Sequence, residues 1–516
     1  MITVEDEMYR PFEDIERKIR KDYETEIYAK FKCAAYSEKE EIGSVLKTAF
    51  SFYEQILEDN LKKVASIDML AFVLSEYENY YEMSIRYKKG QLSEQEVSFW
   101  GEYGSKTKRA LKYLSEKIVA KLPNEVDDNI DHQAALSYCW IAAEEMVALY
   151  MSSQVGYSLF PEECQLTIED SKKYNFIQFK CDKLENAFNA LNLHGFASNE
   201  ELAFSPPFDA SIQNEYFGYV FKKYFNIDYS SCLYLIQSLI GYFNPSDELK
   251  CCYFEKDKMV SCLASDYSEY GLTEEQVVTL LAGFTITKDK LEDRVLYKPK
   301  QEYRALRRAF FEVNDNEKSV VLFSKSMALE ELSHLIRSVS FRKLPSEWTV
   351  LDKKIRLELD KFSNFSGSWF ESFLIRKLRE NNIKCERSLK KIKINGKNNH
   401  IPDAVGDIDV IAQIGNELHI IECKMVQFAS EPTGYIDDLD KFVCDKKSYR
   451  VKFNKKICWV EENIDLIKTY LISKGFAFSN DPVIKPVMVT FYPTIVSDFI
   501  DEFLCLDVNE YLKKSL

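Results

Sequence analysis

Apolar residues recur at three- and four-residue intervals along most of the first two thirds of the chain, with few Gly or Pro residues between them. This spacing places apolar side chains on one face of a helix. It predicts helices at residues 42–61, 93–122 and 134–151, and Thr273 with Gln276 has the residue types of a capping box. We therefore expect a large α-helical region over residues 1–345. Two polar breaks, at residues 124–131 and 204–209, could divide it into two subdomains.

The pattern changes after Pro345, where short runs rich in β-branched residues alternate with helical segments. Helices are expected at residues 348–359, 368–381, 436–448, 460–474 and 495–503, with a polar loop at 363–368. Strands are expected at residues 387–394, 407–414, 417–425 and 483–491. Overall we predict an α+β protein in which the helical region precedes a smaller α/β sandwich domain over residues 346–516.

Two of the predicted strands flank Gly415 and Asn416, a pair typical of tight hairpin turns. If these two residues form the turn, Ile414 pairs with Glu417, and the same ladder places Asp409 opposite Glu422. Alternate residues of a strand share a face, so Lys424 and Asp407 join that side of the hairpin. Ile408, Val410, Ile421 and Cys423 form the opposite, apolar face.

Two carboxylates directly opposed, with Cβ atoms roughly 5 Å apart, repel each other unless a cation lies between them. Asp409 and Glu422 therefore predict a site for Mg²⁺ or Mn²⁺, which prefer oxygen ligands. The backbone carbonyl of Cys423 is a third candidate ligand. The alternative is a surface hairpin in which Asp and Lys pair across the strands without a metal.

This segment resembles the PD-(D/E)xK nuclease superfamily, whose fold is that of restriction endonucleases. The resemblance covers about residues 361–501 and rests on Asp409, on Glu422-Cys423-Lys424 and on Glu371 of the preceding helix. It implies that Asp409 and Glu422 bind the metal, that Lys424 orients or activates the attacking water, and that Glu371 has a supporting role. The catalytic residues expected from it are Glu371, Asp409, Glu422 and Lys424.

Three positions leave alternatives open. Pro402-Asp403 is a literal PD, but the ladder places Asp403 beyond the end of the strand, whereas Asp407 has the correct face and competes with Asp409. Ser368 and Glu371 also fit a capping box, in which the glutamate only starts a helix. Against this, Glu371 has helical spacing with Ile375 and Leu378, which places it beside the apolar stripe.

The formal net charge of -15 excludes a protein whose whole surface binds nucleic acid, so any such contact is local. Two basic runs flank the acidic segment. The first contains Arg376, Lys377, Arg379, Lys384, Arg387, Lys390, Lys391, Lys393 and Lys397. The second contains Lys446, Lys447, Arg450, Lys452, Lys455 and Lys456. Either run could simply be a solvated face, but their position beside the carboxylates favours phosphate binding.

Other classes of site are disfavoured by composition and motifs. Five histidines without ligand spacing and thirteen cysteines without a CxxC pair argue against a zinc site or a disulfide framework. No segment matches a nucleotide-binding glycine loop. The start of the chain lacks an export signal and no segment is long enough to span a membrane, so we expect a cytoplasmic protein.

Together these features predict a magnesium-dependent nuclease that acts on nucleic acid, DNA rather than RNA, for instance in bacterial defence against foreign DNA. Cleavage of both strands would favour a homodimer. One alternative is a catalytically silent nucleic-acid-binding module. The other is a scaffold or target-sensing protein, built from the helical region, with the nuclease domain as its effector.

Overall fold

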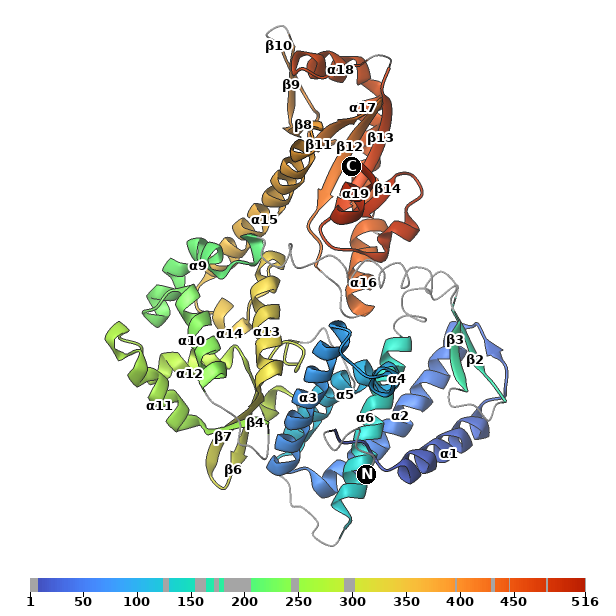
Figure 1. Cartoon of the computed structure of the whole chain (residues 1–516), viewed down its shortest axis with the longest axis vertical. Helices are drawn as coiled ribbons and strands as arrows, with labels where there is room; N and C mark the ends of the chain where they lie inside the picture. Colours follow the sequence, from blue (N-terminus) through green and yellow to red (C-terminus); the bar gives the residue numbers. More distant parts are fainter. Residues whose placement is uncertain are drawn as a thin grey trace. The chain divides into compact units, whose positions relative to one another are not determined.

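The computed structural model describes the chain except for residues 1–7, 124–129, 154–163, 171–175, 181–205, 243–249, 292–301, 395–396, 428–431, 445, 479–480 and 516 (Figure 1). The chain divides into two compact units. The first unit comprises residues 1–181, 210–338 and 343–358, and the second comprises residues 182–209, 339–342 and 359–516. The predicted boundary after residue 345 stays a prediction. One long helix, α15 (Lys353–Glu380), begins in the first unit and continues into the second.

The first unit is largely helical, as the apolar spacing predicts. The helices of its first part are α1 (Glu13–Lys30), α2 (Lys39–Val64), α3 (Ile67–Lys88), α4 (Glu94–Phe99), α5 (Ser105–Lys121) and α6 (His132–Ser153). Those of its second part are α9 (Ala210–Phe225), α10 (Tyr229–Tyr242), α11 (Lys256–Asp266), α12 (Glu274–Ala282), α13 (Lys325–Ser338) and α14 (Ser346–Thr349). Helix α6 packs against α2 and α5 (Figure 1). The capping box of Thr273 and Gln276 is present at the start of α12.

Strands within the first unit were not expected from the sequence. A four-stranded sheet has the order β4-β7-β6-β5, and a three-stranded sheet has the order β1-β2-β3. The strands are β1 (Ala35–Tyr36), β2 (Gln165–Ile168), β3 (Ile177–Lys180), β4 (Cys251–Glu255), β5 (Thr285–Ile286), β6 (Phe310–Asp315) and β7 (Lys318–Ser324). Short runs such as β7, which is buried from Val320 onward, lack the alternation that distinguishes a strand from a buried helix. The predicted break at residues 124–131 lies mostly outside the described residues.

The second unit is built on a mixed five-stranded sheet with the order β14-β13-β12-β11-β8. The strands are β8 (Lys384–Leu389), β11 (Ile408–Ile414), β12 (Glu417–Lys424), β13 (Val483–Thr490) and β14 (Leu504–Asp507). Strand β11 is antiparallel to β8 and β12, whereas β12, β13 and β14 run parallel. A separate hairpin joins β9 (Lys391–Ile394) to β10 (Lys397–His400). The α+β class, with a helical N-terminal region and a sheet-rich C-terminal part, is thus confirmed.

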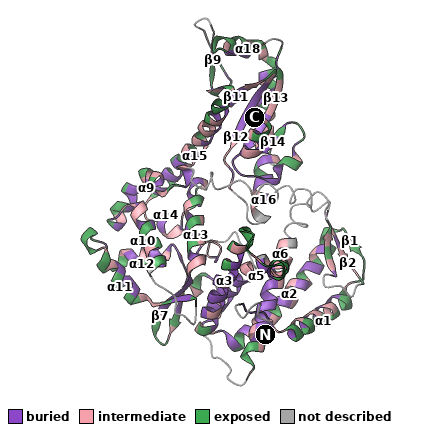
Figure 2. Ribbon diagram, viewed as in Figure 1, coloured by how far each residue is buried: buried purple, intermediate pink, exposed green. Residues whose placement is uncertain are grey.

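Both faces of this sheet are covered, and most of β11 and β12 is buried (Figure 2). On one face, His419 of β12 contacts Tyr511 of α19 (Val508–Ser515), with 3.1 Å between Nδ1 and the hydroxyl. On the other face, Glu422 of β12 contacts Lys456 of α17 (Tyr449–Glu462). The remaining helices are α16 (Pro432–Leu439) and α18 (Ile464–Ser473). The side chains of Asp409 and Glu422 therefore lie beneath helix α17.

Several predictions about this part of the chain were wrong. The strand predicted at residues 387–394 is divided between β8 and β9, and most of α17 was not predicted. The polar loop at residues 363–368 is absent, because α15 runs through it without a break. Ser366 is buried there and its hydroxyl bonds the Phe362 carbonyl inside the helix. The closing helix predicted at residues 495–503 is a short 3₁₀ turn (Ile495–Phe499), followed by β14 and α19.

Among the described residues, no helix is both long and apolar enough to cross a lipid bilayer.

Candidate active site

The β11–β12 hairpin has the register that the sequence predicts. Ile414 pairs with Glu417 and Val410 pairs with Ile421. Asp409 and Glu422 occupy the next position on each strand, and both carboxylates lie beside the ammonium of Lys456. Gly415 has a φ of 60°, a conformation that a two-residue turn requires and that glycine adopts without strain.

Backbone and lysine contacts hold the two carboxylates in place. The Cys423 amide donates to Asp409 Oδ2 at 2.9 Å, which ties the Asp409 side chain to the neighbouring strand. Lys424 Nζ donates to Glu422 Oε1 at 2.6 Å. The sequence predicted that Asp409, Glu422 and Lys424 would converge, and the structure brings all three together.

Lys456 is a fourth member of this cluster, although its place in the sequence indicated only a basic run. Its Nζ donates to Glu422 Oε2 and lies 3.8 Å from Asp409 Oδ1. The side chain is only 6% exposed. A signal was present in the sequence, because the buried residues of α17 are Phe453, Lys456, Ile457 and Val460. Lys456 thus occupies an apolar-stripe position of the helix, where a cation needs a partner.

Burial and neighbouring charges shift the protonation of the two acids in opposite directions. Burial raises the pKa of Asp409 to about 7, and the Glu422 carboxylate adds to the rise. Burial also acts to raise the pKa of Glu422, but the ammonium groups of Lys424 and Lys456 outweigh it and hold that pKa below its ordinary value. Glu422 is therefore the stable anion of the pair, and Asp409 is the acid that titrates near neutral pH.

Lys424 is held in its charged form. Burial acts to lower its pKa, but the carboxylates of Glu422 and Asp409 raise it above the ordinary value for lysine. Its Nζ also lies 4.8 Å from the ring centroid of Tyr449, in a cation–π contact at the start of α17. The Tyr449 ring packs edge-on against Phe442 at 4.9 Å, so the aromatic face beside Lys424 is fixed.

Glu371 does not join the cluster directly. Its carboxylate accepts from Arg387 Nε at 3.2 Å, and the described contacts do not link it to Asp409, Glu422 or Lys424. Arg387 is in register with Val410, on the face of the sheet opposite to Asp409. Burial raises the pKa of Glu371, and the charges of Lys424 and Glu422 also act on it. It therefore lies near the cluster without touching it.

The alternative role for Glu371 as a capping residue is wrong. Ser368 lies inside α15 rather than at its start, so it has no helix N-terminus to cap. Arg387 instead bonds both the Ser368 carbonyl at 2.7 Å and its hydroxyl at 2.6 Å. Glu371 and Ser368 together fix the guanidinium of Arg387 against the helix.

The two competing aspartates lie outside the cluster. Asp407 precedes β11, and its carboxylate pairs with Lys390 Nζ at 3.0 Å rather than with Lys424. Asp403 lies in a turn in which the Val405 amide bonds the Pro402 carbonyl at 2.8 Å. This geometry favours Asp409 over Asp407 and Asp403 as the candidate metal ligand.

The donor set suits a hard divalent cation with few protein ligands. Within the described part of the chain, no three or more His, Cys, Asp or Glu side chains are arranged to hold a metal ion. The groups that could hold a metal ion here are the Asp409 and Glu422 carboxylates and a backbone carbonyl. The Cys423 amide points toward Asp409, and the carbonyl of the same residue points to the same side of an extended strand. Mg²⁺ commonly binds through one or two carboxylates and keeps several waters.

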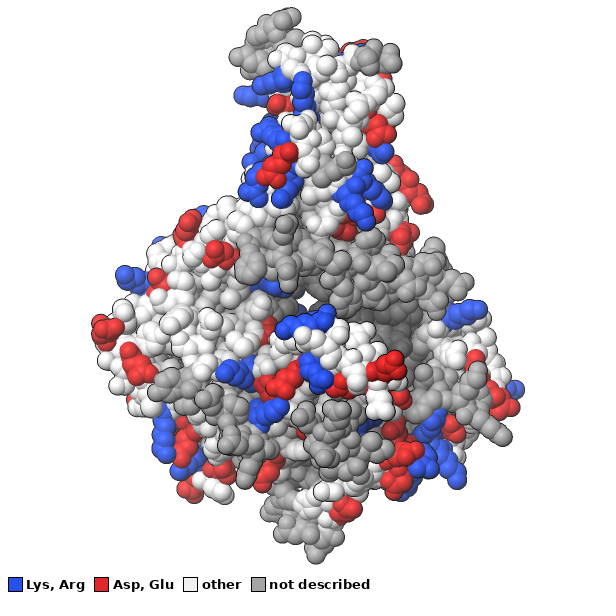
Figure 3. All heavy atoms as spheres, viewed as in Figure 1, with Lys and Arg blue, Asp and Glu red and all other residues white. Residues whose placement is uncertain are grey.

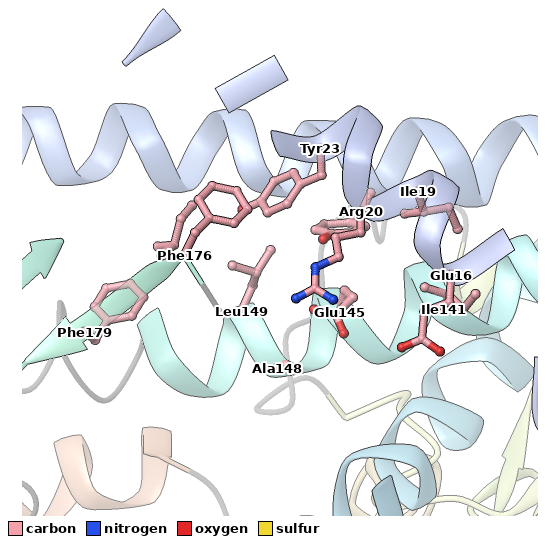
Figure 4. A pocket seen from close by; sticks show the side chains of 12 residues that line it. Glu16, Ile19, Arg20, Tyr23, Ile141, Glu145, Ala148, Leu149, Phe176 and Phe179 are labelled. Carbon is pink, nitrogen blue, oxygen red and sulfur yellow. The ribbon is translucent and has the colours of Figure 1, made fainter. Parts of the chain in front are cut away.

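A pocket of about 190 Å³ in the first unit is a separate candidate (Figure 4). It lies among α1, α2, α6 and β3 and contains the carboxylates of Glu16 and Glu145. Glu16 lies 3.8 Å from the Arg10 guanidinium, and Glu145 lies 3.1 Å from Lys106 Nζ. Each acid therefore has a cation beside it, and we assign no chemistry to this pocket.

Comparisons with protein-family models, with curated proteins and with solved structures match nothing for this chain. The resemblance to PD-(D/E)xK nucleases therefore depends on the residues of the β11–β12 hairpin and their surroundings.

Proposed function

We propose that the second unit is a metal-dependent nuclease that hydrolyses phosphodiester bonds. The observation that carries the proposal is the side-by-side arrangement of Asp409 and Glu422 on antiparallel strands, with the Lys424 ammonium 2.6 Å from Glu422. Phosphodiester hydrolysis requires a bound cation, an activated water and a positive group near the attacked phosphate. Lys424 supplies the positive group, and Asp409 and Glu422 supply ligands for the cation.

Each residue has a distinct role in this proposal. Asp409 and Glu422 hold Mg²⁺ or Mn²⁺, together with the Cys423 carbonyl. When bound, such a cation polarises the phosphate and lowers the pKa of a bound water. Lys424 stays charged beside Glu422, where it can orient the water and stabilise negative charge that develops on the phosphate. Glu371 acts at a distance, by positioning Arg387.

The surface charge of the second unit supports nucleic acid as the substrate. Figure 3 shows groups of Lys and Arg on the visible face of this unit. Lys391, Lys446 and Lys455 are exposed members of the two basic runs. Such side chains bind the phosphate backbone without reading the bases. We favour DNA over RNA, a cytoplasmic location and a homodimer for cleavage of both strands.

A substrate panel tests this function. The full chain is incubated with single- and double-stranded DNA and RNA in Mg²⁺, Mn²⁺ or EDTA. We expect cleavage that EDTA abolishes and that Lys424→Ala lowers by about 100-fold or more. Lys513→Ala is the control, because Lys513 is exposed on α19, away from the hairpin. Metal-independent cleavage, or equal rates for Lys424→Ala and the unmodified chain, would contradict the proposal.

A second candidate is a module that binds nucleic acid without cutting it. The observation in its favour is Lys456, whose ammonium lies beside both carboxylates, where a metal ion would bind. The same panel separates the two functions, since a silent module would retard labelled oligonucleotides in a gel and leave them intact in every metal tested.

For the first unit we propose regulation or target sensing, with the nuclease as effector. Fold-level analogy to other nucleases with helical extensions is the main support for this role. Defence of a bacterial cell against foreign DNA is one setting in which such an arrangement operates.

A further inference from the structure

Lys456 is buried, unlike the other lysines of its basic run. Lys446, Lys447, Lys452 and Lys455 are exposed, whereas Lys456 is buried among Phe453, Ile457 and Val460. Its neighbour Lys455 lies on the solvent side of the same helix. A buried ammonium is costly unless it has close anionic partners, and here both partners are the carboxylates of the candidate metal site.

We propose that Lys456 is a built-in competitor for the metal ion, which must be displaced before the cation can bind Asp409 and Glu422. The inference rests on the proposed function, because it concerns the same two carboxylates. Lys456 Nζ bonds one oxygen of Glu422 and lies 3.8 Å from Asp409 Oδ1, so it stands between the two acids. That is the position a shared divalent cation requires.

The balance of charge explains why the two cations exclude each other. With both acids ionised, two carboxylates are matched by the two ammonium groups of Lys424 and Lys456. A divalent ion added to this cluster would leave a net charge of +2 in a buried site. Like charges a few ångströms apart repel strongly in a buried site, where water screens them poorly. Displacement of Lys456 removes half of that excess.

Lys456, rather than Lys424, is the residue able to leave. Lys424 is a strand residue whose ammonium is also held over the Tyr449 ring, at 4.8 Å. Lys456 reaches the acids from a separate helix on a flexible four-carbon side chain, and long lysine side chains commonly extend their charge toward solvent. Movement of this one side chain would clear the site without changing the strand register.

Lys456 therefore sets the concentration of divalent cation that is needed to fill the site. The full chain should bind divalent cations weakly, and loss of the Lys456 charge should strengthen the binding. An excess of cation, or a phosphate that attracts the displaced ammonium, would favour the metal-bound state.

Calorimetric titration of the full chain with MnCl₂ tests this without using activity. Lys456→Gln removes the charge and keeps a hydrogen-bond donor for Glu422, and Lys456→Met serves as a second uncharged variant if the first folds poorly. Lys456→Arg keeps the charge, and Lys455→Gln is the matched surface control on the adjacent position. We expect the uncharged variants to bind Mn²⁺ about tenfold more tightly or better, a factor that corresponds to about 1.4 kcal/mol. Lys456→Arg and Lys455→Gln should stay within about twofold of the unmodified chain, because both keep the Lys456-site charge.

The outcomes separate the inference from the proposed function. If the unmodified chain binds Mn²⁺ and the uncharged Lys456 variants bind it equally or more weakly, the competition is wrong but the metal site stands. If neither the unmodified chain nor any variant binds Mn²⁺, the metal site itself is wrong, and the inference falls with it.

Discussion

The charges around the hairpin determine the protonation state of each of its acidic residues. Two acids and two lysines share one partly enclosed space, and burial alone would make all four charges unfavourable. The lysines stabilise the anion on Glu422, while burial and the neighbouring Glu422 carboxylate keep the pKa of Asp409 raised. This asymmetry is what makes one acid a fixed anion and the other a titrating group.

The raised pKa of Asp409 predicts a pH-dependent stability of the hairpin. The ordinary value is 3.8 and the folded value is about 7, so the folded state holds this proton more tightly than the unfolded state does. The contribution is therefore favourable at low pH and is lost as pH rises through this range. Asp409→Asn removes the titration, so its stability relative to the unmodified chain should increase as pH rises from about 4 to about 7.

Hydrogen-exchange protection of the β11 and β12 amides at several pH values measures this difference. Protection factors corrected for intrinsic exchange should favour Asp409→Asn increasingly as pH rises. A difference that is constant, or that shrinks toward neutral pH, would mean that Asp409 titrates normally.

Much of the site could be predicted from sequence, because the hairpin is formed by residues that are close together in the chain. The pairing of Asp409 with Glu422 follows from a two-residue turn and strict alternation, which need no knowledge of the rest of the fold. Lys456 could not be placed in the same way, because the packing of α17 against β12 depends on contacts between distant segments. The partner of Glu371 was missed for the same reason, since Arg387 lies on a different strand.

At the scale of elements, the loop predicted at residues 363–368 was wrong because the prediction relied on residue types alone. Residues 363–368 contain Ser, Asn and Gly, which favour loops, but tertiary packing keeps them in the middle of α15. Phe362 and Phe370, both fully buried, lie on either side of this stretch and fix the helix through it. The short strand β14 was not predicted. Its four residues form a strand because they pair with β13, and that pairing is not visible in the local sequence.

Continuity of α15 predicts that Gly367→Ala is stabilising. An added Cβ at this position would meet no atom within 4 Å, and glycine in a helix interior costs about 0.5–1 kcal/mol relative to alanine. Thermal unfolding of the full chain should show a small rise in Tm. Gly415→Ala is the contrasting variant, because its φ of 60° strains any residue with a side chain, and it should lower Tm. Equal losses in both variants would indicate that Gly367 also lies in a loop.

At the scale of the whole molecule, the second unit draws on segments far apart in the sequence. Besides residues 359–516 it includes residues 182–209 and 339–342. Phe208 is 8% exposed, and its ring centroid lies 5.8 Å from that of Phe491. Ser340 Oγ also donates to the Pro207 carbonyl at 2.9 Å. Sequence patterns cannot assign such inserted segments, because the contacts that join them to the sheet are long-range.

These contacts predict that Phe208→Ala destabilises the sheet that carries the site. Loss of a buried phenylalanine costs about 3 kcal/mol or more. Hydrogen-exchange protection should fall in β13, which precedes Phe491, while Tyr234→Ala, at a 63% exposed position, should leave it unchanged. Unaltered protection in β13 would show that residues 206–209 do not belong to this unit.

The central claim is that Asp409 and Glu422 form a metal site that supports phosphodiester hydrolysis. It is tested most directly by the rate of DNA cleavage by the full chain in Mn²⁺, compared between Glu422→Gln and Glu417→Gln. Both residues lie on β12, but Glu417 is at the turn and pairs with Lys485. We predict that Glu422→Gln abolishes cleavage and that Glu417→Gln cleaves as the unmodified chain does. Cleavage at an unchanged rate by Glu422→Gln would contradict the claim.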